Sequence, residues 1–334
     1  MKKNAIPLIL FALLGTATAW YFLTGSEAQK TTLKDPNREF AVQDIDRIQK
    51  IFMADRRGRQ TTLERKGADW IVNGQGKANP NILNNLLQVI RRVEIQFIPP
   101  TTATEPIVQD LSTNGIKVEL YDGKSEPFKV YYVGGTTPDE RGTYMIMEGA
   151  DQPYVTHLPS VSGGLRVRYN IWGENWRDKT VFAYKPGEIA FVSIEYPNFR
   201  SKSFQLYAGD KSYEVEPFYD ITPGDRKAVP SGLAQSYLLG FERVVAEAFE
   251  NENNGRDSIA QQLPFAIITV KTKTGAEKVV ELNPLDQQRV ADKFAATPIE
   301  RYFAEVRPPD DFMMVQHHLF APILRPLEFF LQES

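Results

Sequence analysis

The strongest hydrophobic pattern in the chain lies at its start. Residues 5–23 are mostly apolar and carry no charge, and about 20 such residues are enough for one helix to cross a bilayer. Lys2 and Lys3 precede this run, and positive charge beside a span stays in the cytoplasm. The pattern therefore predicts an N-terminal membrane anchor in residues 1–24, with the rest of the chain outside the cytoplasm.

A cleaved signal peptide is the alternative for the same segment. Ala17 and Ala19 form a small-residue site of the kind that signal peptidase cuts. The apolar run continues past that site to Leu23, which favours a retained anchor. Residues 25–39 are polar and show no periodicity, so we expect them to form a tether.

Regular structure is predicted from residue 40 onward. Short apolar stretches near 48–53, 61–65 and 70–72 alternate with turn signals, which predicts a meander of three strands. Asn79 and Pro80 then open a stretch to residue 93 in which apolar residues recur every three or four positions, as in an amphipathic helix. A shorter helix over 106–111 and hairpins over 116–133 and 143–157 are expected to follow.

The second half of the chain repeats this order. A similar run of strand patterns begins near residue 182, and a helix is predicted from Ser231 through Ala248. A hairpin over 265–282 and strands over 302–306 and 312–315 follow. We therefore expect an α+β protein made of two tandem repeats of an antiparallel sheet with packed helices, in units 40–173 and 174–334, preceded by the transmembrane helix. A single mixed domain with similar halves is the alternative.

Composition removes several functional classes. The 334 residues are 42% hydrophobic and 24% charged, as in a globular protein, and the net charge of −3 gives no basic field for nucleic acid. The chain has no cysteine, which excludes disulfides, thiolate catalysis and an N-terminal lipid on cysteine.

No motif of known chemistry stands out, so we predict no catalytic residue, no metal site and no cofactor. His317 and His318 lie beside a predicted strand end, where neighbouring side chains point to opposite faces and cannot share a metal. Asp310 and Asp311 follow two prolines, and turn propensity explains them. The glycine-containing stretch 160–165 lacks the lysine of a phosphate-binding loop.

The most unusual local composition is YNIWGENWRDKTVF, residues 169–182. Its Trp172, Trp176, Arg177 and Asp178 would suit a partner interface or a sugar-stacking surface. The same residues could instead pin the junction between the two units, with the tryptophans buried. The apolar segment 319–331 could also bind a partner, although docking on its own unit is the more economical interpretation.

The chain resembles a known family in three stretches: FAVQDIDRIQKIFMADRRGRQTTLERKGADWIVNG after the tether, ENWRDKTVF in the centre, and RYFAEVRPPDDFMMVQHHLF near the end. Together they resemble the domain-of-unknown-function 4340 family, especially its long, membrane-anchored Bacteroidetes-type members. The resemblance implies no catalytic residues. It implies an accessory role beside ABC-type or gliding-associated transport systems.

These observations favour a non-enzymatic protein of the inner membrane, crossing it once, with most of its mass in the periplasm. We expect it to bind or scaffold a protein partner in an envelope assembly, an ABC permease being the example that the resemblance implies. A carbohydrate-active or other hydrolytic envelope enzyme that uses Trp172, Trp176 and Asp178 is the alternative.

Overall fold

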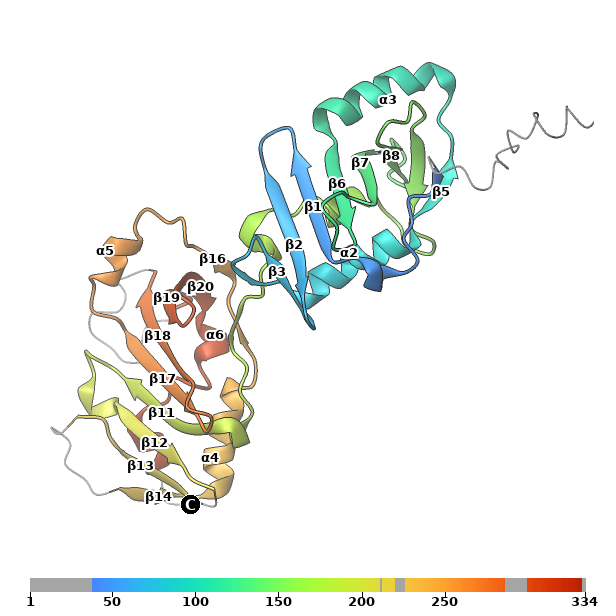
Figure 1. Ribbon diagram of the computed structural model, residues 1–334. Helices are drawn as coiled ribbons and strands as arrows, with labels where there is room; N and C mark the ends of the chain where they lie inside the picture. Colours follow the sequence, from blue (N-terminus) through green and yellow to red (C-terminus); the bar gives the residue numbers. More distant parts are fainter. Residues whose placement is uncertain (1–37, 211, 220–225, 286–298, 332–334) are drawn as a thin grey trace, which may run out of the picture. The chain divides into compact units, whose positions relative to one another are not determined.

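The computed structural model describes residues 38–210, 212–219, 226–285 and 299–331. The chain divides into two compact units, the first ending at Trp176 and the second beginning at Arg177 (Figure 1); the sequence placed this boundary three residues earlier, after residue 173. The predicted anchor and nearly all of the predicted tether lie outside the described residues. Within the described part of the chain, no helix has the length and apolar character needed to cross a bilayer.

The first unit is built on an antiparallel sheet that has nine strands among the described residues, in the order β4-β3-β2-β1-β6-β7-β8-β9-β5. Its strands are β1 (Lys50–Asp55), β2 (Gln60–Lys66), β3 (Asp69–Val72), β4 (Gly76–Lys77), β5 (Glu94–Phe97), β6 (Ile116–Tyr121), β7 (Lys129–Thr136), β8 (Thr143–Met147) and β9 (Tyr154–His157). Alternate residues of these strands are buried, as in a sheet with one face on a core.

Helix α2 (Pro80–Arg92) covers the core face of this sheet. The Asn79 side chain caps it by accepting hydrogen bonds from the backbone of Asn81 and Ile82, as the sequence predicts. The apolar stripe of α2, which includes Leu86 and Ile90, is buried in one cluster with core residues of the sheet. The predicted helix over 79–93 is thus confirmed.

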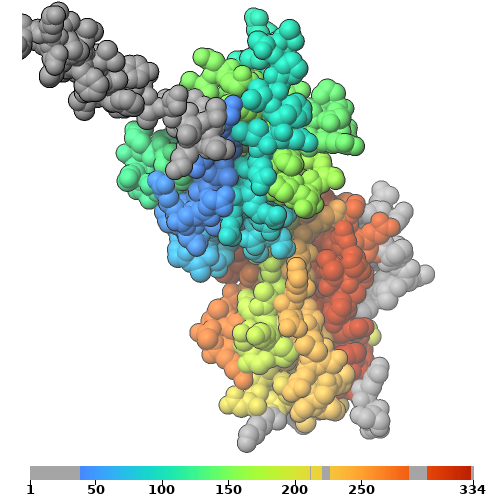
Figure 2. Space-filling model, turned by 90° about the vertical axis from the view of Figure 1, so that its right-hand side faces the viewer, coloured from blue at the N-terminus to red at the C-terminus, as the bar shows by residue number. Residues whose placement is uncertain are grey.

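Helix α3 (Thr101–Asn114) is longer than the helix predicted for 106–111. Pro106 lies inside it, where the sequence interpretation took proline as the start. The space-filling view shows α3, in teal, at the surface of the first unit (Figure 2). Its buried residue Leu111 packs on Gly134, which faces away from the core because it follows the core residue Val133 in β7.

Apart from the two-stranded sheet of β10 and β15, the second unit has the same order of elements as the first. Its described strands are β10 (Thr180–Phe182), β11 (Ile189–Glu195), β12 (Phe204–Ala208), β13 (Tyr213–Pro217), β14 (Lys227–Val229), β15 (Val244–Val245), β16 (Ala248–Phe249), β17 (Ala266–Thr272), β18 (Glu277–Pro284), β19 (Arg301–Arg307) and β20 (Asp311–Gln316). Helices α4 (Ser231–Leu238) and α5 (Arg256–Ala260) take the places of α2 and α3.

The sheets of the two units share one topology. The order of the second, β14-β13-β12-β11-β17-β18-β19-β20-β16, follows the first strand by strand, over the described residues. The registers also agree: Met53 faces Thr61 and Val118 in the first unit, and Ile194 faces Phe204 and Ile268 in the second. The prediction of two similar antiparallel sheets is confirmed.

The helix predicted for 231–248 is wrong in its second half. Helix α4 ends at Leu238, a 3-10 turn covers Leu239–Phe241, and β15 then pairs with β10. The backbone N–H of Tyr184 donates to the carbonyl of Phe241. Phe241 is buried in the 3-10 turn and Val244 in β15, so their helix-like spacing misled the sequence interpretation.

The C-terminal apolar segment docks on its own unit. After α6 (His317–Phe320), the buried residues Phe320, Ile323, Leu327 and Phe330 join the core cluster of the second unit. The ring centroids of Phe330 and Phe204 of β12 are 4.8 Å apart. The structure thus agrees with the more economical of the two interpretations.

Candidate functional site

The two tryptophans singled out by the sequence belong to the first unit. Trp176, in the 3-10 turn η4 (Gly173–Trp176), has no exposed surface. Its indole N–H donates to the carbonyl of Ile171 at 2.6 Å, and its own carbonyl accepts from the backbone N–H of Asn79, the cap of α2. Trp176 therefore fixes the end of this unit to the start of α2, and it is not part of a surface.

Trp172 lies closer to the surface. Its ring is partly buried against the core of the first unit, and its indole N–H donates to Oδ1 of Asn170 at 2.9 Å. The guanidinium carbon of Arg59 lies 4.7 Å from the ring centroid, close enough for a cation–π interaction. Trp172 and Trp176 thus have separate environments and do not form an exposed aromatic pair.

Arg177 and Asp178 belong to the second unit. Arg177 is buried, donates to the carboxylate of Asp311 at 2.8 Å, and lies 4.2 Å from the ring centroid of Phe249. Oδ1 of Asp178 accepts from the backbone N–H and the hydroxyl of Thr180, a local turn. The four predicted residues are therefore not gathered at one site: each is engaged within its own unit.

The turn interpretation is confirmed for Asp310, which lies in the turn over 308–310, and needs correction for Asp311. Asp311 is 7% exposed and begins β20, where it accepts hydrogen bonds from Arg177 and from the side-chain amide of Asn251. Asp310 pairs with Arg256, which also forms a bidentate pair with the buried Glu305. Turn propensity does not explain the burial of Asp311, whose pair with Arg177 helps to hold the second unit together, whereas the pair of Asp310 lies at the surface.

The two neighbouring histidines lie in a helical turn and not in a strand. His317 and His318 begin α6, directly after β20 ends at Gln316. Nδ1 of His317 and the hydroxyl of Tyr302 are 2.8 Å apart. Burial, and then the charge of His318, lower the pKa of His317 below its ordinary value. No group of metal-ligating side chains occurs among the residues that the structure describes.

A polar cleft of about 290 Å³ lies in the first unit, between the β1–β2 turn, the end of α3 and the 3-10 turn η3 (Arg166–Arg168). The described charged side chains that line it are Arg56, Arg57, Arg59, Arg166, Asp55 and Asp110. Asn170, the hydrogen-bond partner of Trp172, also lines this cleft. We call it the arginine cleft.

The β1–β2 turn presents three of these arginines because Asp55 holds it closed. Oδ1 of Asp55 accepts from the backbone N–H of Arg57 and of Arg59, and Oδ2 accepts from the Arg59 guanidinium at 2.9 and 2.6 Å. Gly58 has a φ of +81°, which glycine adopts without strain. Burial would raise the pKa of Asp55, but these hydrogen bonds outweigh burial and lower it.

Arg166 enters the cleft from a distant part of the chain. Its Nη1 donates to the carbonyl of Val133 at 2.8 Å, and its Nη2 donates to the carbonyl of Asn114 at 2.7 Å. Burial is the largest influence and lowers the pKa of Arg166; nearby carboxylates oppose this shift, and nearby arginines add to it. Arg166 is thus a half-buried cation held by neutral acceptors.

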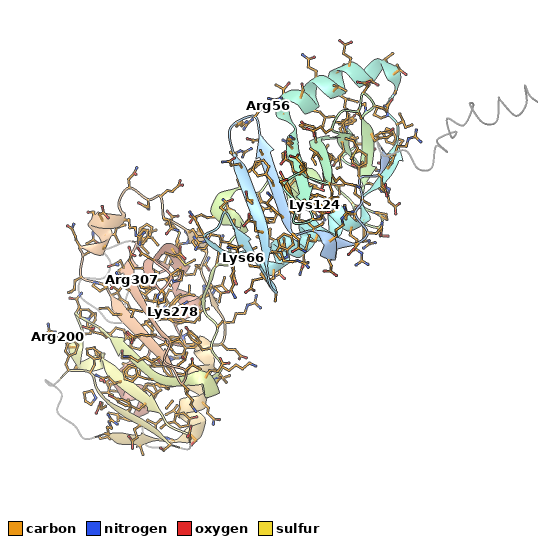
Figure 3. All side chains as sticks on the ribbon, in the orientation of Figure 1. Arg56, Lys66, Lys124, Arg200, Lys278 and Arg307 are labelled. Atoms are coloured by element: carbon orange, nitrogen blue, oxygen red, sulfur yellow. The ribbon has the colours of Figure 1, made fainter. Side chains whose placement is uncertain are left out.

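Arg56 links the cleft to the outer face of the sheet. Its Nε donates to the carbonyl of Ser112 in α3, and Figure 3 places it at the tip of the β1–β2 turn. It also borders a neighbouring hollow of about 300 Å³ that is lined by Lys117 and Tyr132. Lys117 is itself paired with Glu119 and Glu148, so the charge of that hollow is balanced.

The equivalent end of the second sheet is filled. Asp55 lies opposite Ile116 in the β1–β6 ladder, and the matching position in the second unit is Tyr196, directly after β11. Tyr196 has no exposed surface, its hydroxyl donates to the carbonyl of Arg325, and its ring centroid is 5.9 Å from that of Phe265. In the second unit a buried tyrosine therefore occupies the place that the charged cleft has in the first unit.

Sequence reasoning missed this site. The run ADRRGRQ (54–60) concentrates three arginines at a turn, and this local signal was available. Arg166 and Asp110 are far away in the sequence, and only the fold brings them to the same cleft. The chain matches no family model and no curated protein. The resemblance to the domain-of-unknown-function 4340 family therefore stays a prediction.

Proposed function

We propose that this protein is a non-enzymatic, membrane-anchored component of a cell-envelope assembly, and that it binds a partner or ligand of this assembly through the arginine cleft. The apolar run over 5–23 and the preceding lysines support an anchor in the inner membrane with the two units in the periplasm. The family resemblance supports an ABC-type permease as the kind of assembly it serves.

The difference between Asp55 and Tyr196 carries the binding part of this proposal. The two units share strand order and register, so the fold itself does not require a charged, open end of the sheet. In the second unit this end is closed by a buried tyrosine. The first unit instead keeps four arginines around a cleft. Because burying part of a cation costs free energy, a binding role explains why the arginines are there.

Observations at Trp176 and Asp178, two of the three residues that the hydrolytic alternative uses, weigh against it. A sugar-stacking site needs an exposed ring, and Trp176 is buried. A catalytic carboxylate needs access to substrate, and Asp178 is engaged by the backbone and hydroxyl of Thr180. We therefore place the functional site in the arginine cleft.

Recovery of the full chain from membranes tests this proposal. After mild crosslinking and detergent extraction, mass spectrometry should identify the same envelope protein with the wild type in every preparation. Arg57→Glu reverses one charge of the cleft and should lower that recovery several-fold. Arg200→Glu makes the same change at the matching turn of the second unit, where Arg200 lies over Tyr219 (Figure 3), and should leave recovery unchanged.

Three outcomes would contradict the proposal. The chain could be recovered alone under these conditions, or it could fractionate intact with the cytosol. Arg57→Glu and Arg200→Glu could also change recovery equally, which would mean that the partner does not bind through the arginine cleft.

A further inference from the structure

The arginine cleft carries more positive charge than its own carboxylates neutralise. Among its described charged side chains, four arginines face two aspartates. The carboxylate of Asp55 already accepts four hydrogen bonds, all from Arg57 and Arg59. Oδ1 of Asp110 accepts from the side-chain amide of Asn114. Neither carboxylate forms an ion pair or hydrogen bond with Arg166 in the described part of the chain. Both lie near enough to raise its pKa, but two carboxylates against four guanidinium groups leave a net positive charge in the cleft.

The Arg166 guanidinium is held in the cleft by neutral acceptors. Its two described hydrogen bonds go to backbone carbonyls, and within the described part of the chain it forms no ion pair. Two neutral acceptors fix the orientation of the guanidinium without cancelling its charge. A half-buried guanidinium in this state attracts an anion more strongly than an exposed one, because water screens it less.

Arg57 adds a second cation to the lining of the cleft. Its backbone N–H binds Asp55, but no ion pair or hydrogen bond of its guanidinium occurs among the described residues. Arg57 comes from the β1–β2 turn and Arg166 from η3, so cations from two separate segments line one cleft. The neutral polar side chains of Thr113, Asn114 and Asn170 complete the wall.

We propose that the arginine cleft binds a small oxyanion, meaning a phosphate or carboxylate group of a small molecule. Guanidinium groups are the side chains best suited to such groups, because their planar forks donate paired hydrogen bonds to two oxygens. A cleft of about 290 Å³ accommodates a group of this size. The inference deepens the proposed binding function, because it names the chemistry of the ligand at the same site.

Titration of the full chain in detergent with simple anions tests this inference. Inorganic phosphate and citrate are the two probes, and sodium chloride at matched ionic strength is the reference for non-specific charge effects. Isothermal titration calorimetry should detect saturable binding of at least one probe. Binding of phosphate but not citrate would assign a phosphate group, and the reverse would assign a carboxylate.

Three variants locate the binding. Arg57→Gln removes a charge that has no described partner, so it should weaken binding at least fivefold without affecting folding. Arg166→Gln should weaken binding further, and circular dichroism will show whether the unit stays folded. Arg200→Gln in the second unit should leave affinity unchanged. Trp172 gives a second readout, because Arg59 contacts its ring and anion binding should change its fluorescence in the wild type but not in Trp172→Phe.

The inference is overturned if neither probe binds saturably above the chloride reference at a concentration of roughly 10 mM, which would nearly fill a site with a Kd of about 1 mM. Equal affinity in wild type and Arg57→Gln would overturn it as well. Its failure differs from failure of the proposed function. If no anion binds but Arg57→Glu still lowers recovery of the partner, the oxyanion inference fails and the envelope role stands. If an anion binds but the chain is always recovered without a partner, the envelope role fails and the oxyanion site stands.

Discussion

The guanidinium of Arg177 donates a 2.8 Å hydrogen bond to the carboxylate of Asp311, and these side chains keep only 9% and 10% of their surface exposed. The pair joins the first residue of the second unit to the start of β20. Asn251 donates a further hydrogen bond to Asp311. Burial lowers the pKa of the neighbouring Lys278, and the charge of Asp311 opposes this shift.

Removing this carboxylate should destabilise the second unit strongly. Asp311→Ala removes the carboxylate that pairs with the buried charge of Arg177, and such losses cost about 3–5 kcal/mol. Urea denaturation of the full chain in detergent, followed by circular dichroism, measures the change in the free energy of unfolding. The matched control is Asp310→Ala at the next position, where the carboxylate is 74% exposed and its pair with Arg256 is worth less than about 1 kcal/mol. Equal losses in the two variants would contradict a structural role for the Arg177–Asp311 pair.

The β1–β2 turn should depend on the charge of Asp55. Replacing the carboxylate with the amide in Asp55→Asn weakens the hydrogen bonds from Arg57 and Arg59, and we expect a loss of about 1–2 kcal/mol at neutral pH. Asp46→Asn is the control, since Asp46 is 83% exposed in its pair with Arg65 and should change stability by less than about 0.5 kcal/mol.

The same variant predicts a pH dependence. The pKa of Asp55 is lower in the folded chain than in the unfolded chain, so the folded state binds fewer protons in acid. The contribution of Asp55 is therefore complete above its unfolded pKa and is lost as the pH falls through its folded pKa. Wild type should lose more stability than Asp55→Asn across this acid range, and parallel curves for the two proteins would show that Asp55 does not titrate this way.

The sequence predicted those parts of the fold that neighbouring residues determine. The cap at Asn79 and the apolar stripe through Ile90 specify α2 locally, and the strands of both sheets follow their alternating patterns. The prediction failed where the structure of a segment depends on contacts with residues far away in the sequence. Val244 pairs with Phe182 in β10 and so leaves the helix that its spacing suggested. Asp311 is buried because Arg177 reaches it across the second unit.

The candidate site was beyond sequence reasoning for the same reason. Arg56, Arg57 and Arg59 lie together in the sequence, but arginines in a turn are most often solvated and pointed to no site. Their importance comes from Arg166, which the fold brings to the same cleft. The end of the sheet is open where Asp55 stands at the end of β1, and it is filled where Tyr196 stands at the matching position after β11. The two positions can be matched only when the strand registers are known.

His317 should make the second unit less stable in mild acid. Its folded pKa is lowered, chiefly by burial and then by His318, so the unfolded chain takes up a proton at a higher pH than the folded chain does. Its stabilising contribution is present above the unfolded pKa and is lost as the pH falls through that value towards the folded one. Imidazole resonances followed by NMR, assigned with His317→Gln, should titrate below the ordinary value for histidine.

A second variant isolates the cause of this shift. His318→Gln removes the neighbouring charge and should raise the pKa of His317 only in part, because burial is the larger influence. If His317 titrated at the ordinary value in the wild type, its burial beside Tyr302 would not hold in solution.

Gly134 allows α3 to pack on the outer face of the first sheet. A Cβ at this position would lie 2.8 Å from Cδ2 of Leu111 and 3.1 Å from the carbonyl oxygen of Tyr144. Leu111 is 2% exposed and has little room to move, and the carbonyl is fixed in the sheet. Gly134→Ala should therefore displace α3 and cost about 1–3 kcal/mol, as overpacking does elsewhere.

The neighbouring glycine provides the control for this prediction. A Cβ at Gly135 would meet only Oδ2 of Asp110, at 3.9 Å, so Gly135→Ala should change the free energy of unfolding by less than about 0.5 kcal/mol. Hydrogen exchange localises the effect, because amides of α3 should exchange faster in Gly134→Ala while those of α2 keep their protection. Unchanged exchange in α3 would mean that the contact between Leu111 and Gly134 does not hold this helix on the sheet. Since the end of α3 also forms one wall of the arginine cleft, Gly134→Ala should weaken anion binding there as well.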